Sequence, residues 1–590
     1  MATKPWHERP TFLALLALAQ FREQLRKNNL HDTSQFADKE KLPHPAPPDG
    51  DRHLSARMED GSYNDLEHPE MGMVGARFGR NAPIEDAFPD SKNLLNPNPR
   101  EISRRLMTRE EFKPATSLNV LAAAWIQFQN HDWFSHGSNN PNKKINIPLK
   151  EDDPWPQDRR PMNIDETSPD PSRLEGDASA LPTHINEVTH WWDGSQIYGS
   201  TFEKVHELRT HKDGKIKIGE DGFLLEDPTH PGIDFTGFND NWWVGLSLLH
   251  TAFAKEHNYL CDELKKRYPD WNDGQLFDKA RLINAALTAK IHTVEWTPGI
   301  LSHPALQIAM AANWWGILGQ HVKNLFGRVG GGEALSGIVG SHQDHGAAPY
   351  ALTEEFVSVY RLHPLIPDDW KFYSIANGKF LAEKNFQEVA GNRTRGLMAE
   401  IDINDLWYSL GIAHPGAITL HNYPRFLQTL VRDDGQTLDL AMVDVLRDRE
   451  RGVPRYNKFR ELIGMGRVNS FEEICPKNPV WAKELREVYN NDLEAVDLMV
   501  GMYAEDLPQG FGFSDTAFRV FILMASRRLK SDRFFTDDYR KEVYTQFGLD
   551  FIDKTTMIDV ILRHYPKLKP ALFRVPHAFA PWRRVGVSGY

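Results

Sequence analysis

Hydrophobic residues recur at helical spacing over most of the chain. Apolar positions that return every three to four residues mark long segments, for example Leu118 to Phe134, Trp242 to Leu264, Asp278 to Trp296, Leu438 to Arg449 and Ser514 to Leu529. Alternating strand patterns are short and few, and no repeat of fixed period is visible. The pattern therefore predicts a mainly α protein with few short strands.

Two polar, proline-rich stretches interrupt this pattern, near Leu42 to Arg52 and from Asn139 to Pro182. The second has no apolar period and is long enough for a functional or wrapping loop rather than a domain linker. Although 590 residues exceed the roughly 250 to 300 at which cores usually divide, we expect one large helical catalytic domain over residues 36–590.

Residues 1–35 form a separate, amphipathic helical segment in this prediction. The apolar run from Phe12 to Ala19 is far shorter than the roughly 20 residues that span a bilayer. It also lacks the charged start and small-residue cleavage site of a secretory signal. Two interpretations stay open: a helix that caps the core, or an interfacial helix that rests on lipid, with basic residues at Arg22, Arg26 and Lys27. The expected location is cytoplasmic or peripherally membrane-associated.

Composition narrows the function classes. Hydrophobic residues make up 40% of the chain and charged residues 25%, as in a packed globular protein. The net charge is only −12, and no long basic run is present, so we expect no nucleic-acid partner. Two cysteines, Cys261 and Cys475, cannot build a disulfide framework or a zinc site. We expect a monomer in a reducing compartment.

The segment from Thr116 to Trp133 begins with an N-cap residue and continues with strong helix formers. Gln127 and His131 are four residues apart, so they share one face of this helix. Asp132 lies about 100° further round. One helix can thus serve two sites, although a lone His-Asp pair is more often explained by hydrogen bonding within the fold.

A loop with oxygen-bearing side chains follows later in the chain. Thr189, Asp193 and Ser195 alternate along it, and the carbonyl of Trp191 fills the gap. Hard oxygen ligands in this spacing suit Ca²⁺. The alternative is an ordinary turn rich in Asp, Gly and Ser.

A tyrosine and a histidine stand together near the middle of the chain. The segment has Thr353 as N-cap, acidic residues in its first turn and Pro364 at its end, so it is predicted to be a helix. Tyr360 and His363 are three apart and would be neighbours on one face. Histidine is a normal proximal haem ligand, but a core tyrosine beside a helix-terminal histidine explains the pair equally well.

In this order, the three segments resemble the haem and calcium sites of the peroxidase and cyclooxygenase-like superfamily. The resemblance implies a haem cofactor (heme b) with His363 as proximal iron ligand, Asn422 as its hydrogen-bond partner, and His131 with Gln127 on the distal side. It further implies calcium bound by Asp132, Thr189, Trp191 (carbonyl), Asp193 and Ser195.

Within that superfamily the chain resembles the fatty acid alpha-dioxygenases over nearly its whole length. The shared strings include FGRN from Phe78, EFVSVYRLH from Glu355 and SRRL from Ser526. The resemblance implies an oxidoreductase in which a radical on Tyr360 abstracts hydrogen from C2 of a long-chain fatty acid. O₂ then adds to give a 2(R)-hydroperoxy fatty acid.

Such a reaction needs a grip on the fatty acid carboxylate, and arginine offers a planar pair of donors for it. The resemblance assigns this role to Arg528, His292 and Thr297. The neighbouring Arg527 is a competitor for Arg528. His292 and Thr297 are five residues apart, so they face one pocket only if their helix bends or ends near Trp296.

Other functions stay open at this point. Where the superfamily's peroxidases place an arginine that helps to cleave peroxide, this chain reads Glu295-Trp296, which argues against efficient peroxidase activity while allowing a residual one. The alternatives are a haem peroxidase that oxidises small organic donors, and a catalytically idle haem- or calcium-binding protein. The chain lacks the cysteine-rich module of prostaglandin-forming enzymes.

Overall fold

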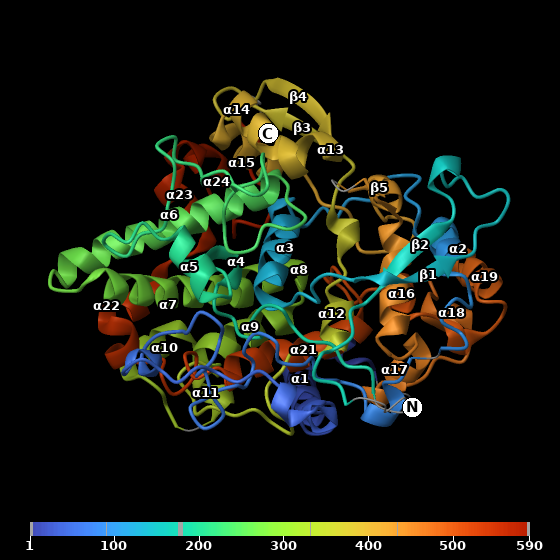
Figure 1. Ribbon diagram of the computed structural model, residues 1–590, viewed down its shortest axis with the longest axis horizontal. Coiled ribbons are helices and arrows are strands. Elements are labelled where there is room, and N and C mark those ends of the chain that lie inside the picture. Colours follow the sequence, from blue (N-terminus) through green and yellow to red (C-terminus); the bar gives the residue numbers. More distant parts are fainter. Residues whose placement is uncertain (1–3, 90, 175–180, 331, 433–434, 587–590) are drawn as a thin grey trace.

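The computed structural model describes residues 4–586, apart from residues 90, 175–180, 331 and 433–434, and shows a mainly helical protein (Figure 1). The helix α3 (Leu121–Trp133) lies near the middle. It packs against α6 (Val244–Arg267), which runs alongside α7 (Asp273–Ile291). The predicted fold class is confirmed.

All five segments singled out by their apolar period are helical. The remaining two are α16 (Leu440–Glu450) and α21 (Asp515–Ser531). The helix α3 begins at Leu121 rather than after Thr116, with Val120 at its N-cap position and no side-chain cap. Because α3 is buried on nearly all sides by other helices, packing rather than capping stabilises its start.

Strands occur as three short antiparallel pairs in the described part of the chain. They are β1 (Asn140–Ile147) with β2 (Met162–Glu166), β3 (Asp369–Tyr373) with β4 (Phe380–Asn385), and β5 (Leu430–Val431) with β6 (Thr437–Leu438). The first pair lies within the stretch that we expected to be a loop without regular structure, and that expectation is wrong. Its inward-facing residues, such as Ile145 and Ile164, pack with Met442 and Leu446 of α16.

The N-terminal helix α1 (Thr11–Asn28) packs against α9 (Pro304–Trp315) and α21. Its inner face carries buried Ala14 and Leu18, whereas Phe12 is 70% exposed on the outer face. No helix among the described residues is both long and apolar enough to cross a membrane.

Candidate active site

The helix α3 presents His131 and Gln127 one turn apart. His131 is buried, and its Nδ1 has no hydrogen-bond partner among the described residues. Burial lowers the pKa of His131 to about 3, so the ring is neutral. The Gln127 amide is held at both ends, because its Oε1 accepts from Trp243 Nε1 (2.7 Å) and its Nε2 donates to Asn241 O (3.1 Å).

Tyr360 and His363 do not share one helix, which corrects the prediction. The helix α12 spans Glu354–Val359, Tyr360 is its C-cap, and His363 starts a short 3₁₀ turn, His363–Leu365. Pro364 accounts for part of this. A proline inside a helix has no N–H to give and clashes with the carbonyl four residues earlier, so the helix cannot continue through residue 364. The helix ends earlier, at Val359, and Pro364 alone does not set that end.

Tyr360 is buried among aromatic rings. Its ring centroid lies 4.6 Å from that of Phe356 and 5.3 Å from that of Trp133, the latter edge to face. Burial raises the pKa of the Tyr360 hydroxyl above its ordinary value, and the nearby Arg528 opposes this only in part. The phenol is therefore protonated at neutral pH and carries a hydrogen atom to exchange.

The partner of His363 is a carboxylate, not Asn422. Asn422 is buried, but its Oδ1 accepts from Arg109 Nε and Lys113 N, and its Nδ2 donates to backbone carbonyls of Lys113 and Ala417. Those four bonds use the amide completely. His363 Nδ1 instead lies 2.8 Å from Asp444 Oδ2, although its N–H is not well aligned with that oxygen.

The oxygen-rich loop lies against the end of α3. Asp132 Oδ1 accepts from Ser195 N (2.6 Å), while Asp193 accepts from the hydroxyls of Thr189 (2.9 Å) and Ser195 (2.5 Å). Trp191 lies in the same loop, and its ring nitrogen donates to Met71 O. All these side chains are buried.

Two carboxylates are thus enclosed together, and the positive charges of Arg528 and Arg57 offset the burial of Asp132 only in part. Burial, and next the charge of Asp193, raise the pKa of Asp132 well above its ordinary value. Asp132 Oδ2 has no hydrogen-bond partner among the described residues, and the closest cation, Arg281, has its Nη2 3.6 Å from Asp193 Oδ2. A buried oxygen without a partner beside a second carboxylate is the environment of a cation site.

Arg528 is packed between aromatic rings, and Asp132 and the Tyr350 hydroxyl lie near enough to favour its charged form. Its guanidinium carbon lies 4.0 Å from the ring centroid of Trp133 and 4.5 Å from that of Trp192. The side chain is 2% exposed, and its Nε and Nη2 have no hydrogen-bond partner in the described part of the chain. Burial lowers its pKa from the ordinary value. Such donors are available to an anionic ligand.

Arg527, the competitor, has a structural role. Its guanidinium donates to the backbone carbonyls of His345, Ala348, Pro349 and Ala351, at distances of 2.7 to 3.2 Å. These bonds tie α21 to the segment before α12. Arg527 therefore has no donor pair aimed at Trp133.

A π-helical turn brings His292 and Thr297 to one face. Residues His292–Trp296 form this turn between α7 and α8 (Thr297–Ile300), and the Thr297 N–H donates to the His292 carbonyl. In a π-helix a residue and the one five positions later lie on the same side of the helix. Two residues five apart, such as His292 and Thr297, can therefore face one pocket here. The Thr297 hydroxyl is buried without a partner among the described residues.

His292 has a defined tautomer. Its Nδ1 accepts from Trp125 Nε1 (3.2 Å), so the ring proton lies on Nε2. Burial lowers the pKa of His292 well below its ordinary value, which keeps the ring neutral. The ring also lies edge to face with Trp133, 5.2 Å between centroids. Trp133 thus contacts Tyr360, His292 and Arg528, so the phenol lies one ring away from two of the three residues predicted for the carboxylate grip.

Glu295, at the position of the missing arginine, points elsewhere. Its carboxylate accepts from the backbone N–H of Met557, at the start of α23 (Met557–His564). Burial raises its pKa to about 7. Glu295 is therefore a structural contact between helices.

Sequence reasoning missed two groups. Asp444 carries no local signal, because it reaches His363 only through the packing of α16 against α12. The second group consists of His136, His184 and Glu354. His136 Nε2 and His184 Nδ1 each lie 3.0 Å from an oxygen of the Glu354 carboxylate. Both histidines satisfy Glu354 at the first residue of α12, which fixes the start of the helix that leads to Tyr360.

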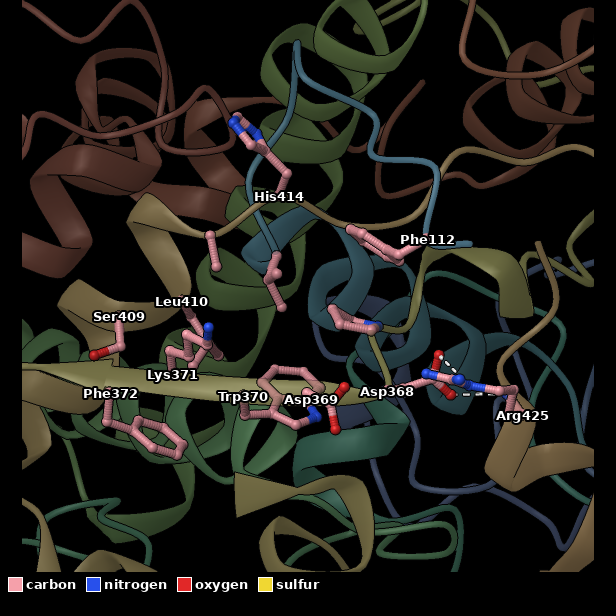
Figure 2. A pocket seen from close by; sticks show the side chains of 13 residues that line it. Phe112, Asp368, Asp369, Trp370, Lys371, Phe372, Ser409, Leu410, His414 and Arg425 are labelled. Carbon is pink, nitrogen blue, oxygen red and sulfur yellow. Dashed lines mark hydrogen bonds and ion pairs between the residues drawn. The ribbon is translucent and has the colours of Figure 1, made fainter. Parts of the chain in front are cut away.

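A surface cavity of about 190 Å³ lies beside β3 (Figure 2). Figure 2 shows Trp370 and Phe372 at its wall, and Asp368 next to Arg425, with 3.8 Å between Oδ2 and Nε. None of the residues predicted for the haem, calcium or carboxylate sites lines this cavity. The candidate active site is instead the set of groups around Trp133.

Known proteins match this chain over almost its full length. A family model described as "Animal haem peroxidase" matches residues 56–575. The alpha-dioxygenase PIOX of Oryza sativa subsp. japonica is 37% identical, covering 98% of this chain and 93% of that protein. Alpha-dioxygenase 2 of Arabidopsis thaliana is 36% identical, with 98% and 91% covered.

Solved structures of related proteins superpose on this chain. A crystal structure of a tyrosine-to-phenylalanine variant of the Oryza sativa fatty acid alpha-dioxygenase with palmitic acid superposes with a TM-score of 0.89 at 36% identity, covering 98% of this chain and 94% of that one. The Arabidopsis thaliana enzyme gives 0.89 at 34%, with 99% and 91% covered. Peroxidase A of Dictyostelium discoideum gives 0.70 at 20% identity, a likeness of fold alone.

Proposed function

The chain belongs to the animal haem peroxidase family and, within it, to the alpha-dioxygenases, and from that premise we propose that it oxygenates C2 of a long-chain fatty acid by a radical on Tyr360. The observation that carries the substrate is Arg528, a buried guanidinium without an acidic partner among the described residues, next to the ring that contacts Tyr360. A fatty acid carboxylate supplies the missing negative charge.

The residues present fit a haem. His363 is 33% exposed although its neighbours are buried, so its Nε2 is available to iron, and the unpartnered nitrogen of His131 supports the distal role. A bound haem supplies the one-electron oxidation of Tyr360 at the expense of a peroxide. We assign His363 as the residue that would hold the iron, and His131 and Gln127 as residues that would face the bound haem.

The chain's own residues then do two things. Arg528 donates from its two unpartnered nitrogens, Nε and Nη2, to the carboxylate, and His292 Nε2–H and the Thr297 hydroxyl add further donors. This grip fixes C2 near Tyr360 and excludes water from the reacting carbon. Trp133 sets the distance between grip and phenol, because it contacts both.

The reaction balances without another reagent. The Tyr360 phenoxyl radical takes one hydrogen atom from C2, which leaves a carbon radical and an intact phenol. O₂ adds to that carbon to give a peroxyl radical, which takes the hydrogen atom back from Tyr360. The product is a 2(R)-hydroperoxy fatty acid, which can lose CO₂ and water to give an aldehyde shorter by one carbon. Tyr360 is regenerated as the radical.

We further propose that calcium occupies the loop between Thr189 and Ser195. Asp132 and Asp193 provide charge, Thr189 and Ser195 provide hydroxyl oxygens, and the Trp191 carbonyl completes the set. The ion neutralises two enclosed carboxylates. It also fixes α3, and therefore His131, since Asp132 directly follows that residue.

We also propose that the outer face of α1 rests on lipid. Exposed apolar side chains cluster on α1 and on α10 (Gly319–Phe326), both of which pack against α9: Phe12, Leu13, Leu16, Leu325 and Phe326. The helices α1 and α9 cover α21 and the π-helical turn, which carry Arg528 and His292. A membrane at this face would deliver fatty acids to the grip.

The test is oxygen uptake by haem-loaded protein with palmitate, with mass analysis of the product. The proposal expects O₂ consumption and a 2-hydroperoxy acid or its C15 aldehyde. Tyr360→Phe should abolish both while the haem spectrum stays unchanged, because the phenol is not an iron ligand. Peroxide-driven dye oxidation without fatty-acid-dependent oxygen uptake would instead support the small-donor peroxidase.

A further inference from the structure

Two histidines and a glutamate meet outside the set of groups around Trp133. His136 follows α3, His184 precedes the oxygen-rich loop, and Glu354 is the first residue of α12. One candidate ligand atom from each side chain lies within 4.8 Å of the other two. Among the described residues, no other three or more His, Cys, Asp or Glu side chains bring their ligand atoms so close together.

The spacing of this cluster suits a tetrahedral metal site. Imidazole nitrogens and carboxylate oxygens bind Zn²⁺ at about 2.0 to 2.2 Å, so neighbouring ligand atoms in a tetrahedron lie about 3.3 to 3.5 Å apart. His136 Nε2 and His184 Nδ1 each lie 3.0 Å from a Glu354 oxygen, which is close to that separation. Small rotations of the three side chains would therefore make room for an ion.

The cluster is enclosed and its rings are held in place. Phe78 stacks on the His136 ring, with 4.4 Å between centroids and 12° between planes, and its backbone N–H donates to the His184 carbonyl (3.0 Å). The Glu354 side chain is 3% exposed and each imidazole 8%. Arg451 is a buried cation whose charge acts on Glu354, so it should limit the affinity for a divalent ion.

We propose that His136, His184 and Glu354 form a metal site, separate from the oxygen-rich loop, that takes a divalent transition-metal ion such as Zn²⁺. Imidazole nitrogen is a preferred ligand of zinc, whereas calcium takes oxygen ligands. The two sites would therefore select different ions. Three protein ligands leave the fourth position of the tetrahedron to a water molecule. The inference goes beyond the proposed oxygenation, in which none of these three side chains takes part.

A bound ion would join three segments that are far apart in the sequence. They are the residues after α3, the approach to the oxygen-rich loop and the start of α12, and they lead to His131, Thr189 and Tyr360. The unfolded chain holds no such preformed site, so metal binding stabilises the folded state. Zinc should therefore raise Tm.

The test is zinc binding to haem-loaded, calcium-saturated protein, measured by equilibrium dialysis with metal analysis and by zinc K-edge X-ray absorption. Wild type should retain one zinc per chain with two imidazole ligands, and zinc should raise its Tm. His136→Gln and His184→Gln each keep an amide donor for Glu354 but remove an imidazole. Each should weaken zinc binding by more than about 100-fold, the most that loss of a residue which only orients a ligand usually costs, and should abolish the rise in Tm.

His421→Asn is the matched control. His421 Nε2 lies 2.7 Å from a single carboxylate, that of Glu484, and asparagine tolerates the positive φ of 56° at this position. Zinc binding should be unchanged in this variant, and an equal loss there would show that scattered histidines bind the ion, which overturns the site.

Two results on the cluster itself would also overturn the proposal. One is a wild-type protein that retains no zinc. The other is equal zinc affinity in wild type, His136→Gln and His184→Gln, which would leave the cluster as hydrogen bonds alone. If one glutamine variant does not fold, the other decides. None of these measurements involves turnover, so their outcome is independent of the proposed reaction.

Discussion

Arg527 and Arg528 are adjacent in sequence and should respond to the same substitution in opposite ways. Arg528→Met removes a buried guanidinium that has no acidic partner among the described residues, and it leaves an apolar side chain between Trp133 and Trp192. Replacing buried charge by apolar volume is often neutral or stabilising by about 1 to 4 kcal/mol. Arg527→Met removes the donors of four backbone carbonyls instead.

The magnitudes follow from the chain length and the bonds. Unfolding of 590 residues has an entropy of about 1.2 kcal/mol/K, so 4 kcal/mol corresponds to roughly 3 °C in Tm. Hydrogen bonds from a charged group contribute about 1.5 to 3 kcal/mol each. Arg527→Met should therefore lower Tm by several degrees, whereas Arg528→Met should leave it unchanged or raise it by about 1 to 3 °C.

For catalytic activity the two substitutions should rank the other way, with Arg528→Met as the more damaging one. Without Arg528 the fatty acid carboxylate is buried without its cation, which costs about 2 to 5 kcal/mol and lowers kcat/KM for palmitate by roughly 30- to 5,000-fold. Arg527→Met, corrected for folded protein, should keep kcat/KM within a few fold. Both are measured by oxygen uptake and calorimetry. An active Arg528→Met, or one that is destabilised as much as Arg527→Met, would refute the assignment of Arg528 as the anion site.

Three further predictions concern other groups. Adding Ca²⁺ to metal-depleted protein should raise its Tm. Asp132→Asn should weaken this rise and should increase the Tm measured without calcium, because it removes one of two enclosed charges. Equal Tm responses to calcium in wild type and variant would contradict the calcium site. Burial raises the pKa of Glu295 to about 7, so its contribution to stability is fully present below about pH 4.5 and is lost as the pH rises through 7. Glu295→Gln should remove this pH dependence. Between pH 4 and pH 8, the stability difference between the variant and the wild type should therefore shift in favour of the variant by up to about 3 kcal/mol. Parallel curves of Tm against pH for the two proteins would disprove it. Replacing Phe12 and Leu16 by serine should reduce the fraction of protein that sediments with phospholipid vesicles. Oxygen uptake with detergent-dispersed palmitate should stay unchanged. Undiminished vesicle binding would exclude α1 as the lipid-binding surface.

The helices were predictable because their apolar periodicity is local, and the five singled-out segments are all helical. What failed depended on contacts between distant segments. Thr116 is a good N-cap by type, but α3 starts at Leu121 because its surroundings bury it. The stretch after Asn139 has no apolar period, yet the isoleucines of its hairpin find their core on α16.

The same distinction holds within the candidate site. Residue type and spacing were enough to nominate Tyr360, His363 and the oxygen-rich loop, since those signals lie within single segments. Asn422 was a wrong partner for His363, because the choice between it and Asp444 depends on how α16 packs. Pro364 shows how far local chemistry reaches: it excludes a helix that continues through residue 364, but it does not place the observed end at Val359.

The π-helical turn at His292–Trp296 amounts to one extra residue in an otherwise α-helical segment. In a regular α-helix, which turns about 100° per residue, two residues five positions apart lie about 140° apart around the helix axis. The π-helical turn removes this offset and gives His292 and Thr297 a common face. The carboxylate grip is thus encoded by the type of helix as well as by its residues. A substitution that converts this turn to regular α-helix would separate the two side chains without changing either of them.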